Sequence, residues 1–471
     1  MSTRPEYEGD YVPLPEEEPE AEEPSVRQAL LIVVAPPVVL VESDPVSNLG
    51  FQQDQALKAN RAFAQELLSL SEIVADRQPD ELDDEKELQE SLKLSPAESL
   101  ETLFKLRKIG AGLRAQLSNE LVGTLHYNGF LKGDDRDEPS ITFQEGAKAP
   151  ILWEMMYEGS QKGSPDWERF WGFSVPITHW VHKTRTEEIR LRYGLFSAID
   201  EDLKFAGQEV AILARRLPPV LPRRSLAKAL EEQVRQALLA RMGGEADKVE
   251  AWWKTSETSL WLAHFLDQLA ENEARLREFH AKLWKEETLV TIFGNNFNYD
   301  LIHFACHCEV SEETEFLTRL DMKMGGELVS LDVSLMATDL KRQLRSSQDP
   351  GPLVFLNACG TCQQSASYEP PGFPIQWIRG QGALAVVATL CPVPDYFAHA
   401  FARKFYDILL GALANPEAVG SARNRYLAEA LLQTRRYFME TYNNPLGFAY
   451  VLYAYKGAHV LADFAPVGVA P

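Results

Sequence analysis

The stretch "DLIHFACHCEV", Asp300 to Val310, has the pattern of a buried strand that ends in reactive side chains. Its apolar residues are Leu301, Ile302, Phe304 and Ala305, and its metal-capable or catalytic residue types are His303, Cys306, His307 and Cys308. A second apolar run, "GPLVFLNAC", ends at Cys359 and is typical of a strand that is buried on both faces. Two buried strands that both end in reactive side chains are the feature from which fold and function can be predicted.

Strand-like and helix-like segments alternate around these two runs. "IRLRYGLFSAI", "ALAVVATL" and "FAYVLYAY" read as strands, whereas "LKFAGQEVAILARRL" and "DYFAHAFARKFYDILLGAL" read as helices. This alternation predicts an α/β fold with a mostly parallel sheet and helices on both faces. Because open parallel sheets carry their chemistry at the carboxyl ends of the strands, we expect His307 and Cys359 to face each other there.

A histidine beside a cysteine is the pairing that thiol catalysis requires. The thiolate is the nucleophile, and an imidazole can take up the thiol proton and later return it to the leaving amine. His307 precedes Cys359 by 52 residues, close to the spacing of about 50 residues in caspases. The segment "NACGT" keeps the Ala-Cys-Gly of the caspase motif but has Asn357 in place of Gln and Thr361 in place of the final Gly.

The segments "HFACHC", "LVFLNAC", "GALAVVATLCPVPDYFAHAFARKFYDILLG" and "AVGSARNRY" together resemble the CHAT family, caspase-like proteases of clan CD that are related to separase. The resemblance extends over roughly residues 100–460 and implies a caspase-like fold and cysteine endopeptidase activity. It implies a dyad of His307 and Cys359, with the backbone N–H groups of Cys308 and Cys359 as the oxyanion hole. The family usually has Gly where this chain has Cys308, which keeps the N–H but is less free in φ.

Two further residues are candidates for the substrate pocket. Asn357 lies on the same strand face as Cys359, and the matching Gln of caspases lines the pocket for the residue before the cut. It could instead cap the end of its strand. Asp395, in "VPDYF", begins a predicted helix, so it is either an N-cap or an acidic wall of the pocket.

Two other functions compete with a protease. The four cysteines of one C-x-C and one C-x-x-C segment, Cys306, Cys308, Cys359 and Cys362, are ligand types that suit a zinc-binding interaction module. Strand alternation argues against this alternative, because it sends His307 to the opposite side from Cys306 and Cys308. The other alternative is a catalytically inactive caspase-like scaffold, against which the presence of both His307 and Cys359 speaks.

The chain divides into three predicted parts. Residues 1–25 are acidic and predict a disordered tail, residues 26–188 a pseudo-caspase-like or regulatory region, and residues 189–465 the caspase-like CHAT protease domain with a helical insert at 225–286. Within the second part, residues 55–75 have helical spacing. Ser95, Pro96 and Glu98 have the pattern of an N-cap, a first-turn proline and a capping box.

Composition limits the surroundings and partners. A net charge of −22 and a pI of about 4.9 argue against direct binding of nucleic acid, and no apolar run is long enough to cross a membrane. Five cysteines and an acidic N-terminal segment favour a reducing, cytoplasmic location. We expect a protein substrate, no cofactor and no metal. The resemblance implies a role in bacterial antiviral defence, with the protease latent until an activating partner engages it, such as a CRISPR effector or a gasdermin-type system.

Overall fold

The computed structural model describes residues 30–35, 38–41, 53–79, 85–117, 122, 141–145, 151–180, 188–191, 195–200, 202–209, 239, 244–255, 301–309, 319–324, 327–332, 351–358, 372–414, 426–454 and 457–462. The predicted acidic tail at residues 1–25 and most of the predicted helical insert at 225–286 lie outside these ranges. Among the described helices, none is both long and apolar enough to span a membrane.

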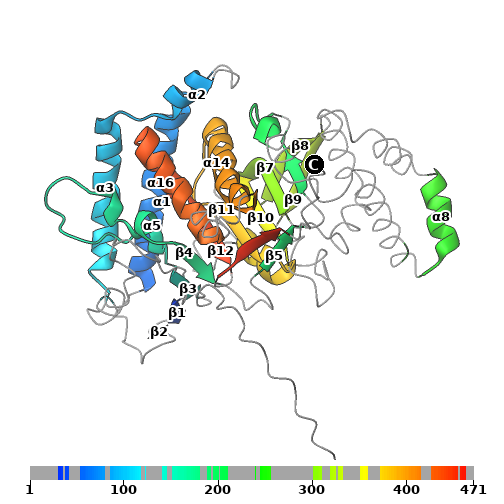
Figure 1. The fold of residues 1–471 in the computed structure, drawn as a ribbon, viewed down its shortest axis with the longest axis horizontal. Helices are drawn as coiled ribbons and strands as arrows, with labels where there is room; N and C mark the ends of the chain where they lie inside the picture. Colours follow the sequence, from blue (N-terminus) through cyan, green and yellow to red (C-terminus); the bar gives the residue numbers. More distant parts are fainter. Residues whose placement is uncertain are drawn as a thin grey trace, which may run out of the picture.

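One sheet of eleven strands organises the described residues, in the order β2-β1-β3-β4-β12-β11-β10-β7-β8-β9, with β6 also paired to β7 (Figure 1). The strands are β1 (Leu30–Ala35), β2 (Val38–Val41), β3 (Ile141–Glu145), β4 (Ile177–Trp180), β6 (Leu195–Ile199), β7 (Leu301–Glu309), β8 (Arg319–Met324), β9 (Glu327–Asp332), β10 (Leu353–Ala358), β11 (Ala385–Thr389) and β12 (Tyr450–Ala454). Six of the ten pairings in this sheet are parallel, which confirms the predicted mostly parallel sheet.

The run "IRLRYGLFSAI", predicted as one strand, forms two strands with different partners. Its first part is β5 (Glu188–Leu191), which pairs with β13 (His459–Ala462) in a separate two-stranded sheet. Its second part is β6, which joins the main sheet beside β7. The single-strand prediction was wrong because alternation alone does not distinguish one long strand from two strands that are separated by a glycine, here Gly194.

Helices cover both faces of the sheet, as predicted. The described helices are α1 (Gln53–Ala75), α2 (Glu85–Leu92), α3 (Pro96–Arg114), α5 (Trp171–Ser174), α8 (Ala246–Thr255), α13 (Gly372–Ile375), α14 (Asp395–Ala414) and α16 (Leu427–Tyr442), with short turns η1 (Trp153–Met155), η2 (Trp167–Arg169), π-helical η4 (Gln376–Gly380) and η5 (Pro445–Ala449). Successive side chains of β7 point to opposite faces of the sheet. On one face His303 contacts Tyr406 of α14, and on the other the Phe304 ring lies 5.7 Å from the ring of Trp377 of η4.

The core strands owe their position to uninterrupted apolar sequence. Every residue of β10, β11 and β12 is buried, as expected of strands covered on both faces. The aromatic rings of Phe401 in α14 and Tyr450 in β12 stack 3.8 Å apart, and Phe401 also contacts Phe438 of α16. The two C-terminal helices are therefore packed together on one face of the sheet, and α14 also reaches the strands of the predicted site through Tyr406, which contacts His303 and Phe355.

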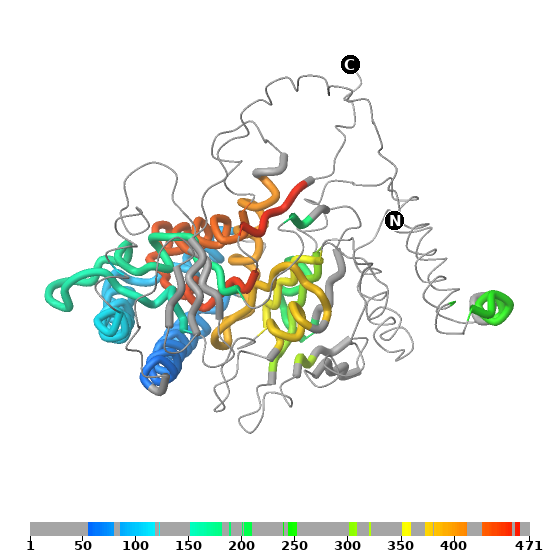
Figure 2. Tube along the Cα trace, turned by 90° about the horizontal axis from the view of Figure 1, so that it is seen from below, coloured from blue at the N-terminus to red at the C-terminus, as the bar shows by residue number. Residues whose placement is uncertain are grey.

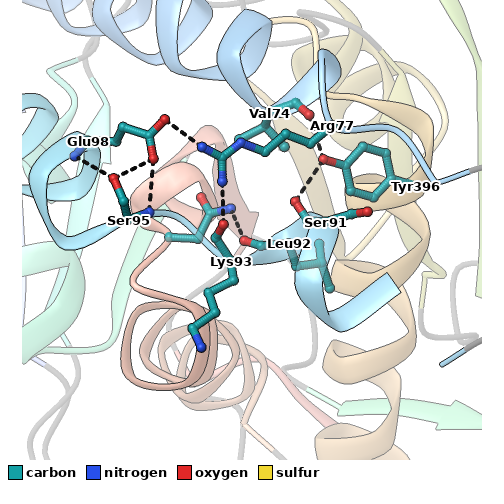
Figure 3. Close-up of polar contacts among 9 residues, drawn as sticks. Val74, Arg77, Ser91, Leu92, Lys93, Ser95, Glu98 and Tyr396 are labelled. Atoms are coloured by element: carbon teal, nitrogen blue, oxygen red, sulfur yellow. Dashed lines mark hydrogen bonds and ion pairs between the residues drawn. The ribbon is translucent and has the colours of Figure 1, made fainter. Parts of the chain in front are cut away.

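Helix α3 begins where the sequence predicts. Ser95 caps α3 by accepting the N–H of Glu98, while Glu98 accepts the N–H of Ser95 at 2.9 Å, so the predicted capping box is confirmed (Figure 3). The hydrogen bonds from Ser95 and the guanidinium of Arg77 hold the pKa of Glu98 at about 2. Helix α1 covers the predicted helix at 55–75 and extends it by two residues at its start.

These N-terminal helices are also tied to the start of α14. The hydroxyl of Tyr396 donates to the carbonyls of Val74 at 2.6 Å and Ser91 at 3.2 Å, which belong to α1 and α2 (Figure 3). Ser71 of α1 donates to the carbonyl of Pro392 at 2.7 Å. Figure 1 and Figure 2 both show the blue and cyan helices α1 and α3 at one end of the sheet, on the side of the orange-red α16.

A buried ionic cluster connects strand β4 to helix α16. Glu154 of η1 lies 2.9 Å from Nε2 of His179 and 3.4 Å from Arg435, and all three side chains are at most 1% exposed. Burial opposes ionisation of Glu154, but His179 and Arg435 hold its pKa at about 2. Since β4 also pairs with β12, strands from both sides of residue 188 belong to one sheet. The exact domain boundaries stay a prediction.

We expect Glu154→Gln to lower the free energy of unfolding by about 3–5 kcal/mol, because it leaves a buried guanidinium without its counter-charge. Chemical denaturation at neutral pH measures this loss. Glu101→Gln is the matched control, since Glu101 is 71% exposed and pairs only with Lys105 among the described ion pairs. An effect of Glu154→Gln as small as that of the control would contradict a stabilising role for the cluster.

Candidate active site

His307 lies at the carboxyl end of β7, where that strand extends beyond both of its parallel neighbours. On one side β6 ends at Ile199, paired with Ala305, and on the other β10 ends at Ala358, paired with Cys306. The side chain of His307 is 56% exposed. The structure therefore places this predicted residue at the edge of the sheet where open parallel folds carry their chemistry.

Cys359 follows directly after Ala358, but Cys359 and Cys362 both lie outside the described residues. What the structure describes is the pair that precedes the predicted dyad. Cys306, the residue before His307, and Ala358, the residue before Cys359, are paired neighbours in adjacent parallel strands. The two strands thus reach the same edge of the sheet at the same level, and the dyad itself stays a prediction.

Cys308 continues β7 in extended conformation and pairs with Leu320 of β8. Among the described residues other than glycine, only Asn443 has a positive φ, so Cys308 occupies backbone that any residue can adopt. The Cys that stands at the family's Gly position is therefore accommodated without strain. The oxyanion role of the Cys308 and Cys359 N–H groups stays a prediction.

Sequence reasoning missed Asp200, the residue that follows β6. Its N–H donates to the carbonyl of Ala305 at 2.8 Å, and its Oδ2 lies 3.8 Å from Nε2 of His307. The Asp200 side chain is 4% exposed, so a buried carboxylate faces the candidate catalytic imidazole. The strand-end rule that identified His307 could have identified Asp200 too, because the predicted strand "IRLRYGLFSAI" ends at Ile199, directly before it.

A buried polar network lies on the face of the sheet that α14 covers. His303 contacts the hydroxyl of Tyr406 at 3.0 Å through Nδ1, and its Nε2 lies 2.7 Å from Oε1 of Glu209. The same Glu209 oxygen accepts the amide of Asn357 at 2.8 Å. Burial, together with the charge of Glu209, raises the pKa of Tyr406 well above its ordinary value. His303 is therefore a core residue, as residues of that strand are expected to be, with polar partners from distant segments.

Asn357 belongs to this network, with both of its polar atoms engaged. Its Nδ2 donates to Glu209, and its Oδ1 accepts the Tyr450 hydroxyl at 2.7 Å. Its side chain is buried, with the residue 6% exposed. In this state the amide fixes β10 to β12 and to the segment after Asp200. The pocket role expected from the caspase motif stays a prediction.

Asp395 is the first residue of α14, and its Oδ2 accepts the N–H of Phe205 at 2.8 Å. Burial raises the pKa of this carboxyl to about 6 against the lowering effect of the Phe205 N–H. The negative charges of Glu209 and Asp200 raise it further, and His307 lowers it. Asp395 thus shares the electrostatic environment of His307, and its role as a pocket wall stays a prediction.

No three His, Cys, Asp or Glu residues within the described part of the chain form a group that could hold a metal ion. The zinc alternative needs Cys359 and Cys362, which fall outside that part. Of the other two members, Cys306 is buried and Cys308 is half-buried.

We expect Asp395→Asn to raise the thermal midpoint by a few degrees at pH 8 and to give no such gain at pH 4.5. The folded-state pKa of about 6 lies above the ordinary value of 3.8, so the folded state binds the proton more tightly. Stability from this group is therefore present below pH 4 and is lost as the pH rises through 6, an effect on the order of 2–3 kcal/mol. The asparagine keeps an acceptor for Phe205 without the charge.

Thermal melts of Asp395→Asn and of the exposed neighbour Asp202→Asn, recorded between pH 4.5 and 8, test this expectation. Equal midpoint differences from the natural chain at both pH values would show that Asp395 carries no buried charge.

Comparison with known proteins identifies the family to which this chain belongs. The model of the CHAT domain matches residues 195–445, just over half of the chain. Among curated proteins, no sequence matches. Solved structures that align include the Arg-specific cysteine proteinase gingipain R (RgpB), at 10% identity and a TM-score of 0.36 over 73% of this chain and 69% of that one. They also include the complex of Porphyromonas gingivalis RgpB pro- and mature domains, at 11% identity and a TM-score of 0.33 over 77% of each chain.

TM-scores this low carry no argument about activity or specificity, so the assignment depends on the family match. The matched segment includes β7, which carries His307, and the strands β6, β8 and β10 that pair with it. The chain belongs to the CHAT domain family, the caspase-like cysteine peptidase family that its strand-end motifs resemble.

Proposed function

We propose that this chain is a cysteine endopeptidase that cleaves a protein substrate with Cys359 as nucleophile and His307 as general base and acid. The observation that carries the proposal is the pairing of Cys306 with Ala358. It brings the strand ends that precede His307 and Cys359 to one edge of the sheet, within the segment that the CHAT domain matches.

The chemistry follows from these roles. The thiol proton of Cys359 passes to His307, and the thiolate attacks the scissile carbonyl. The N–H groups of Cys308 and Cys359 stabilise the oxyanion, as preorganised donors do in acyl transfer. His307 then returns the proton to the leaving amine, and water hydrolyses the thioester that remains.

We expect Cys359→Ala and His307→Ala each to reduce peptide cleavage by at least about 10³-fold, because members of a dyad act as one unit. A proteome-derived peptide library, with the new N-termini identified by mass spectrometry, measures cleavage across many candidate sequences at once. Cys306→Ala and Cys362→Ala are the controls and should retain activity.

Cys306 is a suitable control because it directly precedes His307 in the sequence. It is buried, and its side chain points to the opposite face of the sheet from His307. Activity that survives Cys359→Ala but not Cys362→Ala would assign the nucleophile to Cys362. Loss in every variant with a lowered thermal midpoint would reflect unfolding instead, so each variant is also melted.

The proposal includes control of this activity. An unregulated endopeptidase is toxic in the cytoplasm, where we place this chain, and family resemblance favours a latent protease in bacterial defence. A partner that orders the loops after "ACHC" and "NACGT" would shift a minor active state to dominance. Moving the population from about 1:99 to 99:1 takes about 5.5 kcal/mol of differential binding.

We expect the purified chain alone to cleave a reporter peptide at least tenfold more slowly than the chain mixed with proteins encoded beside its gene. Deletion of residues 1–25 or 227–286 then shows which segment receives the signal. Full activity of the isolated, uncleaved chain would refute latency while leaving the dyad proposal intact.

A further inference from the structure

From the contact between His307 and Asp200 we infer that Asp200 is the positioning residue of the dyad. The inference rests on the proposed function. The Nε2 atom of His307 lies 3.8 Å from Oδ2 of Asp200, which leaves Nδ1 as the ring nitrogen for the thiol. This distance exceeds a hydrogen bond, but catalytic contacts in resting enzymes are often long and tighten in the working complex.

Asp200 is held in place by the fold on both sides of its side chain. Its own N–H donates to the carbonyl of Ala305, two residues before His307 in β7. Its Oδ1 accepts the N–H of Asp202 at 2.9 Å, a turn that fixes the carboxylate and leaves Oδ2 to face the imidazole. The carboxylate is thus attached to the strand that carries His307, so the two groups keep their relative position.

The burial of Asp200 strengthens its interaction with a protonated His307. Asp200 is 3% exposed, and a buried carboxylate needs a cation or donors to compensate for lost hydration. When His307 takes the proton of Cys359, the imidazolium supplies that cation. Asp200 therefore stabilises the thiolate–imidazolium pair and holds the Nε2–H tautomer, whereas the proton that moves is carried on Nδ1.

Three other carboxyl groups in this region have contacts of their own. Asp321 of β8 is paired with His307 through the backbone ladder, Asp395 of α14 accepts the N–H of Phe205, and Glu209 lies against His303 and Asn357. Within the described part of the chain, the carboxyl group at ion-pair distance from His307 is that of Asp200. The positioning role is thus assigned to the end of β6.

The test uses the full chain under the conditions in which it cleaves peptide, including any activating partner. Asp200→Asn keeps an acceptor for the Asp202 N–H but removes the charge that faces His307. We expect kcat/KM to fall by about 100-fold, less than for loss of a dyad member. Asp200→Glu should recover part of this loss. Glu101→Gln, which removes one exposed carboxylate from α3, should stay within about twofold of the natural chain.

A second readout separates positioning from structure. The rate of Cys359 alkylation by iodoacetamide is followed from pH 5 to pH 9.5 on the Cys359 peptide by mass spectrometry. In Asp200→Asn we expect the neutral-pH rate to fall at least tenfold, with an unchanged rate at pH 9.5, where a free thiol ionises without help because its ordinary pKa is about 8.5.

Neutral-pH alkylation in Asp200→Asn equal to that of the natural chain overturns the inference and leaves the proposed dyad standing. A rate reduced equally at all pH values shows altered access and also overturns it. The third outcome is that Cys359 of the natural chain is alkylated at neutral pH no faster than Cys359 of His307→Ala. His307 then does not activate the thiol, so the proposed function and the inference fail together.

Discussion

The parallel pairing of β7 with β10 is the interaction on which the candidate site depends. Its register runs without interruption from Leu301 with Leu353 to Cys306 with Ala358. A shift of one residue would exchange the faces of every side chain in one strand, so that His303 could no longer face Tyr406. Both strands are buried over this register, which a one-residue shift would not preserve for side chains that face α14.

The network beneath the site adds specificity to that register. Glu209 contacts side chains of both strands, since it lies 2.7 Å from His303 of β7 and accepts a hydrogen bond from Asn357 of β10, while Tyr450 donates to Asn357 from β12. Burying polar groups is costly unless their partners are in place. All of these partners meet in the observed order of β7, β10 and β12, so the network favours this alignment of the three strands.

Much of this arrangement could be predicted from the sequence, because it rests on local patterns. Uninterrupted apolar runs identified β7, β10 and β11, and the Ser95, Pro96 and Glu98 pattern identified the start of α3. His307 lies near the carboxyl end of β7, as the apolar run before it indicated, and its catalytic role stays a prediction. The partners of Glu154, Glu209 and Asp200 could not be predicted, since each joins segments far apart in the chain, as Asn357 and Glu209 do across 148 positions. The sequence also could not show that "IRLRYGLFSAI" forms two strands. Each half pairs with a different strand, and these pairings follow from the topology of the whole fold.

The place of β12 has a consequence for modularity. This strand lies between β11 and β4 and supplies Tyr450 to the network, yet it follows the segment that the CHAT domain matches, and β4 precedes that segment. A piece of chain cut at residues 195 and 445 would lack the strand that pairs with β11 and the acceptors of Tyr396 in α1 and α2. The unit that can be transferred between proteins as a working cassette is therefore larger than the stretch that identifies the family.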